Sequence, residues 1–556
     1  MRKLFKNYWA LILIVILAAG LRLYDLGKTP PSLMWDETAL GYNAYSILKT
    51  ARDEYGNFLP VIFKSFGDYK PGLYVYLTVP FVAVFGLSEM AVRLPSALGG
   101  VATVLLVYLL TRAFFPKEKF SIGEIAALVL AISPWHIEFS RGAWEANLAV
   151  FLVVFGTLVF LKALQDTRFL PLAAVIFGLT FLAYQGAKVF TSLFIFGLLI
   201  FYQKDIRKIS VRVLLVSAFC LAIFLAPIFW GTLSGMGGRA RVMSVFSYPR
   251  SGEEIQEILN QDKISQSSLI FRLFHSETLN FGRGILGRYF NHFSGRFLFF
   301  EGDWSNKRLG VPYMGVMYFI EITFLLVGIY FLARQKETRA RNFIFYWLLI
   351  SPLPAAATRD SISAVRALNM VIPLVFITGV GIYQTILWLK NYSRLIQCIL
   401  YSIFCILYSW NFFYFLDQYF IHAPIHNSST SQYGYREVVN FVAPIAKNYD
   451  KIIFTQKYGQ PYIYWLFYTK YNPSDYQKQA YLKENPWGDV GMVEKVSDIE
   501  FRNVYWPTDR GCQNCLFIDD EFGLPDKDIS QTKGAKILKE VRFLDGRLAF
   551  RIAIKD

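Results

Sequence analysis

Long apolar stretches recur along this chain, and they constrain its fold more than any other feature. Runs of about 18 or more residues with few charges alternate with polar gaps from residue 8 to about residue 416. A backbone inside lipid must satisfy its own hydrogen bonds, so these runs predict helices that cross a membrane. Hydrophobic residues make up 54% of the 556 positions, more than in an average soluble domain. No small-residue cleavage site follows the first run, 8–23, so we expect a retained helix there rather than a signal peptide.

The polar gaps fall into two sets that differ in charge. The basic set lies at the start of the chain and near residues 117, 165, 207, 337 and 392. The other set is acidic, aromatic or long, and comprises 25–94, 135–147, 184–189, 231–311, 358–366 and the chain after about 417. Because basic loops face the cytoplasm, alternating the two sets predicts about eleven spans, a cytoplasmic N-terminus and an extracytoplasmic C-terminus. We therefore expect a multi-pass protein of the plasma membrane.

The formal net charge of +16 fits this arrangement. Basic residues cluster between the apolar runs, where they set topology and contact anionic lipid head groups. We expect membrane lipids as partners and no nucleic acid.

The segment 72–87 tests the topology. It is apolar, but it is only 16 residues long and contains Pro80. If it crossed the membrane, every later loop would change sides and the basic loop near 337 would lie outside. We therefore predict an interfacial or re-entrant helix on the outer face, within a long first outer loop over 25–94.

The chain changes character at about residue 417. The tail is polar and rich in tyrosine, and it mixes a helix-like stretch with strand-like ones such as KIIFTQ and CLFIDD. This predicts a membrane domain over 1–416 and an extracytoplasmic α/β domain over 417–556. Cys512 and Cys515 in the tail form CQNC, which is compatible with a disulfide, a redox pair or half of a zinc site. No second CxxC exists, and an extracytoplasmic location favours the disulfide.

Two adjacent acids, Asp36 and Glu37, stand in MWDETALGYNAYSI, just after the first apolar run. The stretch is helix-like after about Asp36. Asp36 at that position has a structural interpretation as an N-cap, with Glu37 favoured by the helix dipole. The surrounding tyrosines and Trp35 indicate instead a polar pocket at the interface. Capping and catalysis are compatible.

Further charged residues lie on the same predicted side. Arg141 and Glu145 are four residues apart in SPWHIEFSRGAWEANLAVF, so on one helix they share a face and are able to pair. Lys70 precedes the apolar segment 72–87, where it either extends to the head groups or holds a phosphate as a point charge. Arg93 and Arg366 stand where outer-face helices begin, against the positive-inside rule, so each requires an anionic substrate or a neighbouring acid.

Together these residues predict acids and cations at the outer leaflet. Cations there suit a lipid-linked phosphate, and an acid suits deprotonation of an acceptor hydroxyl or amine. Transfer of a group from a lipid phosphate to an outside acceptor needs this combination. A lipid flippase or transporter without transfer activity is the alternative. Transporters place ionisable residues near the middle of the bilayer, whereas these lie at span ends or in outer loops.

The same segments resemble the membrane-bound glycosyltransferases of the GT-C superfamily. They are most similar to glycosyltransferase family 39, which includes the protein O-mannosyltransferases and the bacterial lipid A aminoarabinose transferases. The resemblance covers roughly residues 8–380. It is carried by WDE at 35–37, DYKPGLYVYL and GLSEMAVRLPSALGG within 68–100, SPWHIEFSRGAWEANLAVF at 133–151, YQGAKVF at 184–190, NHFSGRFLFFEGD at 291–303 and RALNMVIPL at 366–374.

The resemblance implies a GT-C fold and an inverting transfer of one sugar from a polyprenyl-phosphate donor. The acceptor would be a protein, a lipid or a cell-envelope glycan. Asp36 matches the family's catalytic base, Glu37 the neighbour that contacts the acceptor or the base, and Lys70 the lysine that holds the lipid phosphate. Arg141 and Glu145 match an arginine and a carboxylate of the second outer loop. The chain departs from the family pattern at Gly72, where a second proline is usual, and at Glu145, where an Asp is commoner.

We therefore expect two groups of site residues. The catalytic group is Asp36, Glu37 and Glu145. The group that binds the donor phosphate or the rest of the substrate is Lys70, Arg93, Arg141, Arg366 and Tyr184. Some family members bind a divalent metal near these acids, and His136 is the candidate ligand here. A rival within the superfamily, a block-transferring oligosaccharyltransferase, would carry a Trp-Trp-Asp motif in its tail, and this tail has none.

Overall fold

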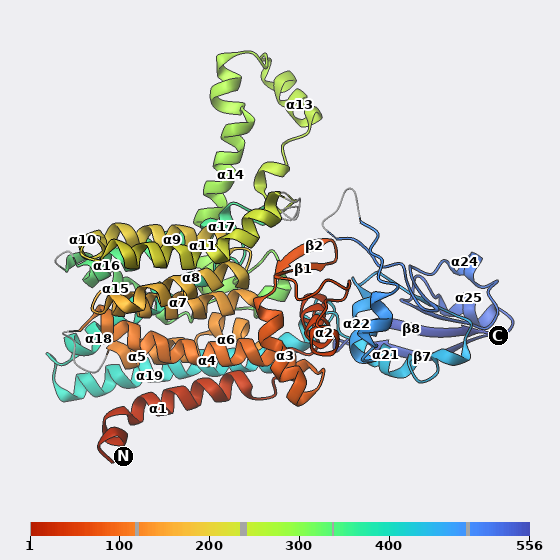
Figure 1. Cartoon of the computed structure of the whole chain (residues 1–556), viewed down its shortest axis with the longest axis horizontal. Coiled ribbons are helices and arrows are strands. Elements are labelled where there is room, and N and C mark those ends of the chain that lie inside the picture. Colours follow the sequence, from red (N-terminus) through yellow and green to blue (C-terminus); the bar gives the residue numbers. More distant parts are fainter. Residues whose placement is uncertain (1, 117–121, 234–241, 336–337, 485–489) are drawn as a thin grey trace.

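Apolar helices lie side by side and make up the larger part of the molecule, as the computed structural model shows (Figure 1). The structure describes residues 2–116, 122–233, 242–335, 338–484 and 490–556, so the predicted basic loops near 117 and 337 lie partly outside the described residues. The bundle helices are α1 (Arg2–Leu23), α4 (Glu89–Phe114), α5 (Ile122–Ile132), α7 (Glu145–Ala163), α8 (Leu170–Ala183), α9 (Ala187–Phe201), α11 (Val211–Leu233), α15 (Glu321–Arg334), α16 (Arg339–Ile350), α18 (Val371–Leu389) and α19 (Arg394–Asp417).

Five helices in the described part of the chain are long and apolar enough to cross a membrane by themselves. These are α4, α7 and α11, α18 with the turn before it, and α19 with the turns after it. The number rises to six if α5 and α6 (Pro134–Arg141), which meet at a 55° bend, form one broken span. Helices α1, α3 (Leu73–Phe85), α8 and α9 are apolar but shorter. The chain is a multi-pass helical membrane protein, and the figure of about eleven spans stays a prediction.

Glycines allow two bundle helices to approach unusually closely. A Cβ atom at Gly381 of α18 would collide with the backbone of Phe324 in α15, and one at Gly328 of α15 would collide with Ile377 in α18. Small residues at such crossings let the backbones touch, which is how helices gain packing contacts in lipid. The contact of α15 with α18 therefore depends on both glycines.

The segment 25–94, predicted as the first outer loop, folds at one end of the bundle (Figure 1). It contains helix α2 (Trp35–Thr50), a hairpin of β1 (Ile62–Ser65) and β2 (Asp68–Pro71), and helix α3 (Leu73–Phe85). The predicted helix over 72–87 is thus present, and its 13 residues are too few to span a bilayer unaided. Helix α2 begins one residue before Asp36, close to the predicted start.

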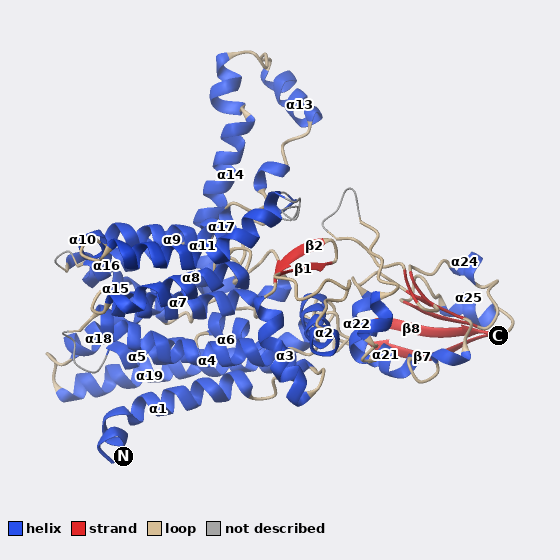
Figure 2. Ribbon diagram, in the orientation of Figure 1, coloured by secondary structure: helices blue, strands red, loops and turns tan. Residues whose placement is uncertain are grey.

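The tail forms a six-stranded sheet beyond this loop, at the end of the molecule far from most of the bundle (Figure 2). Its strand order is β4 (Lys495–Val496), β5 (Ile499–Phe501), β3 (Lys451–Phe454), β6 (Cys515–Asp519), β8 (Leu548–Lys555) and β7 (Ala535–Arg542). Strands β5, β3 and β6 are parallel, and the outer pairs are antiparallel. Helices α21 (Tyr435–Val442), α22 (Pro461–Tyr468), α23 (Pro473–Gln477), α24 (Trp506–Asp509) and α25 (Asp526–Gln531) accompany it. The α/β character predicted for the tail is confirmed.

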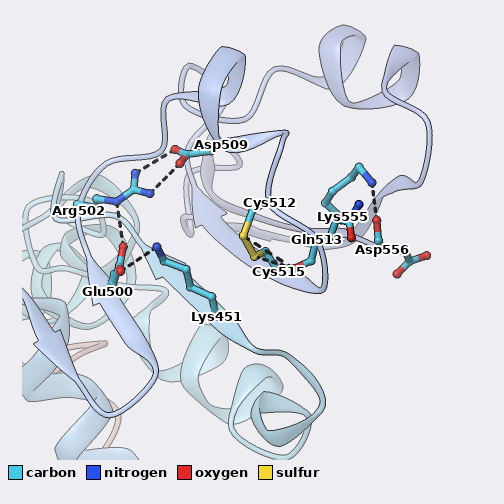
Figure 3. Close-up of a disulfide and its surroundings, with 9 residues drawn as sticks. All are labelled: Lys451, Glu500, Arg502, Asp509, Cys512, Gln513, Cys515, Lys555 and Asp556. Carbon is cyan, nitrogen blue, oxygen red and sulfur yellow. Dashed lines mark hydrogen bonds and ion pairs between the residues drawn. A yellow bond between two sulfur atoms is a disulfide. The ribbon is translucent and has the colours of Figure 1, made fainter.

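The CQNC motif stands at the start of β6, where Cys512 and Cys515 form a disulfide (Figure 3). Beside it, Arg502 forms ion pairs with Asp509 and Glu500. Of the three interpretations left open, the structure has the disulfide.

A helical arm leaves the side of the bundle (Figure 1). It consists of α13 (Gly252–Asp262), a turn of π-helix over Phe271–His275, and α14 (Glu277–Asn291). The remaining helices are short: α10 (Gln203–Ile206), α17 (Leu353–Ala356), α20 (Ala423–His426), five 3-10 turns (Thr167–Phe169, Val245–Ser247, Lys307–Leu309, Leu368–Met370 and Ala446–Asn448) and two further π turns (Arg296–Glu301 and Gln418–His422).

Candidate functional site

Glu37 is a buried carboxylate at the first turn of α2, with only 3% of its surface exposed. Its two oxygens accept hydrogen bonds from the backbone N–H groups of Met34 (3.0 Å) and Ala143 (2.7 Å) and from the guanidinium of Arg93 (3.2 and 3.4 Å). The residue that caps α2 is therefore Met34, so the interpretation of Asp36 as the N-cap is wrong. Glu37 reaches back to the Met34 N–H, as the acid of a capping box does.

Arg93 enters this cluster from α4 and is wholly buried. Besides Glu37, it donates to the backbone carbonyls of Leu26 (3.1 Å), Pro30 (2.9 Å) and Ser32 (2.6 Å). The five N–H groups of a guanidinium are thus engaged within the protein. Of its two predicted partners, Arg93 has the neighbouring acid, and its contacts hold the segment 26–32 against the start of α4.

The Asp36 side chain is half-exposed, whereas that of Glu37 is buried. The Asp36 carboxylate forms an ion pair with Lys70 of β2 and accepts a hydrogen bond from the Trp35 indole N–H at 3.0 Å. The Asp36 side chain is 45% exposed, whereas that of Lys70 is 10% exposed, and the ammonium lies 5.6 Å from the centre of the Phe66 ring. The structure therefore brings together the predicted base and the predicted phosphate ligand.

The Asp36–Lys70 pair lines a small pocket between α2 and the hairpin. Its walls combine polar and apolar side chains: Asp36, Ala39, Leu40, Asn43, Phe63, Ser65, Lys70, Pro71 and Val75. The space is small, about 250 Å³ with open solvent included.

Arg141 and Glu145 stand on different helices. Helix α6 ends at Arg141 and α7 begins at Glu145, so the expectation that the two residues share a helix face is wrong. The break over 142–144 is what allows the Ala143 N–H to reach Glu37. Arg141 donates to the carbonyls of Leu21 (2.8 Å) and Thr29 (3.0 Å).

Glu145 lies near the same acids. Burial, together with the negative charges of Glu37 and Glu145, raises the pKa of Tyr74 in α3 well above its usual value. Glu37 and Glu145 thus both act electrostatically on the Tyr74 hydroxyl. Asp36 and Glu37 lie in the first turn of α2, and Glu145 is the first residue of α7.

His136 occupies a different environment. It is buried in α6, and its Nδ1 lies 2.7 Å from Nη2 of Arg22. Across the described ranges, no group of three or more His, Cys, Asp or Glu side chains is arranged to hold a metal ion. The neighbour of His136 is thus the cation Arg22 and not an acid that could share a metal ion with it. The structure gives no support to His136 as a metal ligand.

Arg366 belongs to a separate cluster. It forms an ion pair with Asp360 and donates to the Thr358 hydroxyl at 3.2 Å. Its loop is anchored by Asp303, which accepts the Ala364 N–H at 2.8 Å. Like Arg93, Arg366 has a neighbouring acid as its partner.

Tyr184 is the C-cap residue directly after α8, beside the hairpin that carries Lys70. The next residue, Gln185, donates through its side-chain amide to the carbonyl of Tyr69 in β2. The YQG turn therefore holds the hairpin against the bundle.

Glu37 lines a second space, which is larger than the pocket of Asp36 and Lys70. It encloses about 600 Å³, open solvent included, and is formed by the first outer loop, α6 and the segments near 310 and 425. Its walls include Glu37, Glu138, Trp144, Arg308 and Tyr419. The Arg308 guanidinium lies 5.7 Å from the centre of the Trp35 ring. Trp35 thus connects this space to Asp36.

Gln432 is a site residue that the sequence analysis missed. Its Oε1 accepts the backbone N–H of Trp35 and the hydroxyl of Tyr464, both at 2.9 Å, and its amide donates to the carbonyl of Tyr458 at 2.7 Å. It lies 397 positions from Trp35, so no local pattern marks it.

Comparisons with known proteins bear on the family and the fold of this chain. The sequence model of the family described as dolichyl-phosphate-mannose-protein mannosyltransferase matches residues 69–230. Two relatives from Bacillus subtilis are named as putative mannosyltransferases. YycA is 27% identical over 225 residues, which cover 38% of this chain and 31% of that protein. YkcB is 29% identical over 171 residues, which cover 30% and 22%. The matched region thus spans less than a third of each curated relative.

Among solved structures, ArnT from Cupriavidus metallidurans bound to undecaprenyl phosphate is similar along its whole length. It covers 98% of each chain with a TM-score of 0.56 and 10% identity. The chain therefore has a GT-C-like helical fold with a sheet region at its C-terminal end. The resemblance to GT-C glycosyltransferases, and to glycosyltransferase family 39 among them, is confirmed.

Proposed function

We propose that this protein is an inverting glycosyltransferase. It moves one sugar from a polyprenyl-phosphate donor to a hydroxyl or amine of a protein, a lipid or a cell-envelope glycan. The observation that carries the proposal is the pairing of the half-exposed Asp36 with Lys70 in one pocket at the end of the bundle. The family match over 69–230 and the ArnT-like fold support it.

Asp36 is the general base of the proposed reaction. Its carboxylate takes the proton of the acceptor group while the acceptor atom bonds to the anomeric carbon of the sugar. The bond from that carbon to the phosphate oxygen breaks, and the lipid phosphate leaves with the electron pair. Attack from the face opposite the leaving group inverts the configuration. A positioned base of this kind contributes roughly 10²–10⁴ to the rate.

Lys70 holds the donor phosphate. Without donor, its ammonium is paired with Asp36. A phosphate in the pocket competes for the ammonium and releases the carboxylate to accept a proton. Lys70 then stabilises the negative charge that grows on the leaving phosphate.

Glu37, Arg93 and Arg141 position the site. The contacts of Glu37 with Arg93 and the Ala143 N–H fix the first turn of α2 against α4 and the start of α7. Arg141 ties α6 to the carbonyls of Leu21 and Thr29. These three residues set the place of Asp36, and Glu145 adds a carboxylate at the start of α7.

The proposed site faces the extracytoplasmic side. Helix α2, the hairpin and α3 occupy the end of the bundle that carries the sheet domain (Figure 1). With basic loops at the cytoplasmic face, this end lies outside. The C-terminal sheet domain then stands next to the site, where an acceptor approaches.

The test is turnover by the purified full chain in nanodiscs, supplied with a panel of labelled polyprenyl-phosphate sugars and membrane extract as acceptor. Asp36→Asn should lower the rate on the accepted donor by roughly 10²–10⁴, because the amide cannot take the acceptor proton. The variant should fold normally, since Asp36 is half-exposed.

Asp25→Asn is the matched control. Asp25 is an exposed carboxylate in the same outer loop, paired with Lys28 at 3.7 Å, and its loss should leave the rate unchanged. Equal rates for wild type and Asp36→Asn would refute the assigned base. If no donor is consumed, while labelled lipid crosses the membrane, the protein is a transporter instead.

A further inference from the structure

The arm formed by α13 and α14 has no counterpart in the proposed chemistry. It projects from the side of the bundle, across the direction in which the bundle helices run (Figure 1). Its direction is fixed at its base, where the Tyr289 hydroxyl donates to the carbonyl of Leu349 (2.9 Å) and the Asn291 amide to that of Ser361 (3.0 Å). Since bundle helices cross the membrane, an arm set across them runs along its plane.

Helix α14 is amphipathic. At 100° per residue, its apolar side chains occupy one half of the helix surface. These are Leu279, Phe281, Ile285, Leu286, Tyr289 and Phe290. Leu286 and Phe290 are 56% and 63% exposed, so this side of the apolar half is uncovered in the described chain. The Phe281 ring, nearer its other border, packs on that of Phe246 with 5.3 Å between ring centres. Arg283 and Arg288 fall at the two borders of the apolar half, and Asn280 lies at the centre of the polar half.

The tip of the arm is likewise apolar and basic. Leu269, Ile270, Leu273 and Phe274 are each more than half exposed, and Arg272 stands among them. The acids lie elsewhere: Glu253, Glu254, Glu257 and Asp262 are all on α13, and Glu277 of α14 is paired with Arg250 at 2.9 Å. The arm therefore has one apolar and basic segment and one acidic segment.

We propose that the arm is a membrane-interface anchor that binds an anionic lipid surface. Its apolar half lies at the boundary between acyl chains and head groups, and its arginines contact lipid phosphates. Basic residues that border an apolar helix face are the pattern of helices lying in the interface plane. The attraction of arginines to anionic lipids adds to the apolar burial. The acidic α13 faces water.

The surface of the bundle supports this placement. Exposed apolar side chains cover α11, where Val211, Leu215, Phe219 and Phe229 are each at least 65% exposed, as expected of a lipid-facing helix. The arm follows α11 in the chain after the undescribed residues 234–241. Because α11 runs to the outer end in the proposed orientation, the anchored leaflet is the outer one.

The test uses the full chain in nanodiscs that contain anionic and zwitterionic lipids. The free cysteines Cys220, Cys398 and Cys405 are replaced by serine, and an environment-sensitive fluorophore is attached at Leu286→Cys. Asn280→Cys on the opposite face is the matched control, and Phe274→Cys reports on the tip. Quenching by brominated lipid should be roughly threefold stronger at 286 and 274 than at 280, and iodide in the buffer should quench in the opposite order.

The arginines are tested separately from the apolar face. Arg272→Gln with Arg283→Gln should lower the lipid quenching at 286 by roughly twofold in anionic nanodiscs. Weak lipid quenching at both 286 and 280 would place the arm in water and overturn the proposal. Strong lipid quenching at both would make the arm a submerged helix. Protection of 286 from both quenchers would mean that a second copy of the chain covers it. Neither of these outcomes fits an interfacial anchor.

Discussion

Glu37 and Arg93 form an ion pair whose side chains are only 4% and 0% exposed. Removing one partner of such a pair leaves an uncompensated buried charge, because water cannot reach it. The carboxylate also satisfies two backbone N–H groups, that of Met34 three residues before it and that of Ala143 106 residues after it. A change at either residue therefore disturbs the start of α2, α4 and the link between α6 and α7 together.

Arg93→Met should lower the free energy of unfolding by about 3–5 kcal/mol, because Glu37 is left charged and buried. Thermal unfolding in detergent, followed by loss of the monodisperse peak in size-exclusion chromatography, measures the effect. Arg436→Met is the matched control, since Arg436 pairs with Glu89 at 3.2 Å with half of its side chain exposed. The control should cost about 1 kcal/mol or less.

A double variant separates charge from packing. Glu37→Gln combined with Arg93→Met removes both charges and should recover part of the stability lost in Arg93→Met. If the double variant is less stable than Arg93→Met, the loss comes from packing and not from an unpaired charge.

Much of the candidate site could be predicted from the types of its residues and from their order within short segments. Asp36 and Lys70 stand in recognisable segments, and both were expected at the outer face. The positive-inside rule marked Arg93 and Arg366 as cations that need a partner, and each has an acid. The shared helix face predicted for Arg141 and Glu145 is wrong for a local reason: helical spacing does not continue across Gly142, where the chain leaves α6 and the Ala143 N–H donates to Glu37.

Helix α2 is held at both ends by the C-terminal part of the chain. At its start, Gln432 accepts the Trp35 N–H. At its other end, the Gln477 amide donates to the Ser46 and Thr50 hydroxyls (3.1 Å) and to the carbonyl of Asp53 (2.9 Å). The 16 residues of α2 separate these contacts by roughly 24 Å. Asp36 and Glu37 lie at the first of these two ends.

Gln432→Ala should therefore lower turnover by roughly tenfold or more, because Trp35 and the adjacent Asp36 lose their fixed position. Gln477→Ala removes a comparable set of contacts from the far end of α2 and should leave turnover nearly unchanged. Gln432→Glu keeps an acceptor for the Trp35 N–H and should retain more activity than Gln432→Ala. Rates measured in nanodiscs at saturating donor compare the three variants. Equal losses for Gln432→Ala and Gln477→Ala would mean that docking in general, and not the position of Trp35, sets the rate.

The helices and strands could be predicted better than the contacts between them. The helix after Asp36, the short apolar helix near 72–87 and the mixed tail follow from periodicity and length. The docking of α22 and α23 on α2 does not, because its bonds join residues about 400 positions apart. Tyr464, for example, donates to the carbonyl of Leu33, and no local spacing encodes that contact.

The membrane domain and the sheet domain meet over a buried polar cluster around Glu54. The Glu54 carboxylate accepts hydrogen bonds from the Asn43 amide (3.2 Å) and from the Tyr462 hydroxyl of α22 (3.5 Å). Burial raises the pKa of Glu54 to about 8, and the neighbouring charge of Asp53 adds to the rise. The interface of the whole molecule thus contains an acid that is protonated at neutral pH.

The sign of the pH effect follows from this pKa. The unfolded chain releases the Glu54 proton near pH 4.5, whereas the folded chain keeps it to about pH 8. The contribution of this carboxyl to stability is therefore fully present below pH 4.5 and is lost as pH rises toward 8. Each unit of difference in pKa corresponds to roughly 1.4 kcal/mol.

Between pH 5.5 and 8.5 the melting temperature of the protein should therefore fall, and Glu54→Gln should flatten this dependence and raise the melting temperature at pH 8.5. Calorimetry in detergent at a series of pH values measures both. Glu484→Gln is the matched control, because Glu484 lies at the same interface, is 71% exposed and pairs with Lys64 at 3.1 Å. The same pH slope in wild type and Glu54→Gln would assign the dependence to other groups.

The hydrogen bond from the Trp35 N–H to Gln432 forms only late in the synthesis of the chain. In the proposed orientation, α2 emerges from the translocon near the beginning of synthesis, and Gln432 follows 397 residues later. At about 5–20 residues per second, the ribosome needs roughly 20–80 s to make that stretch. During this interval the nascent chain contains Asp36 and Lys70 but lacks the residue that fixes Trp35. If the proposed function holds, we therefore expect a stalled or shortened chain to insert into the membrane without becoming active.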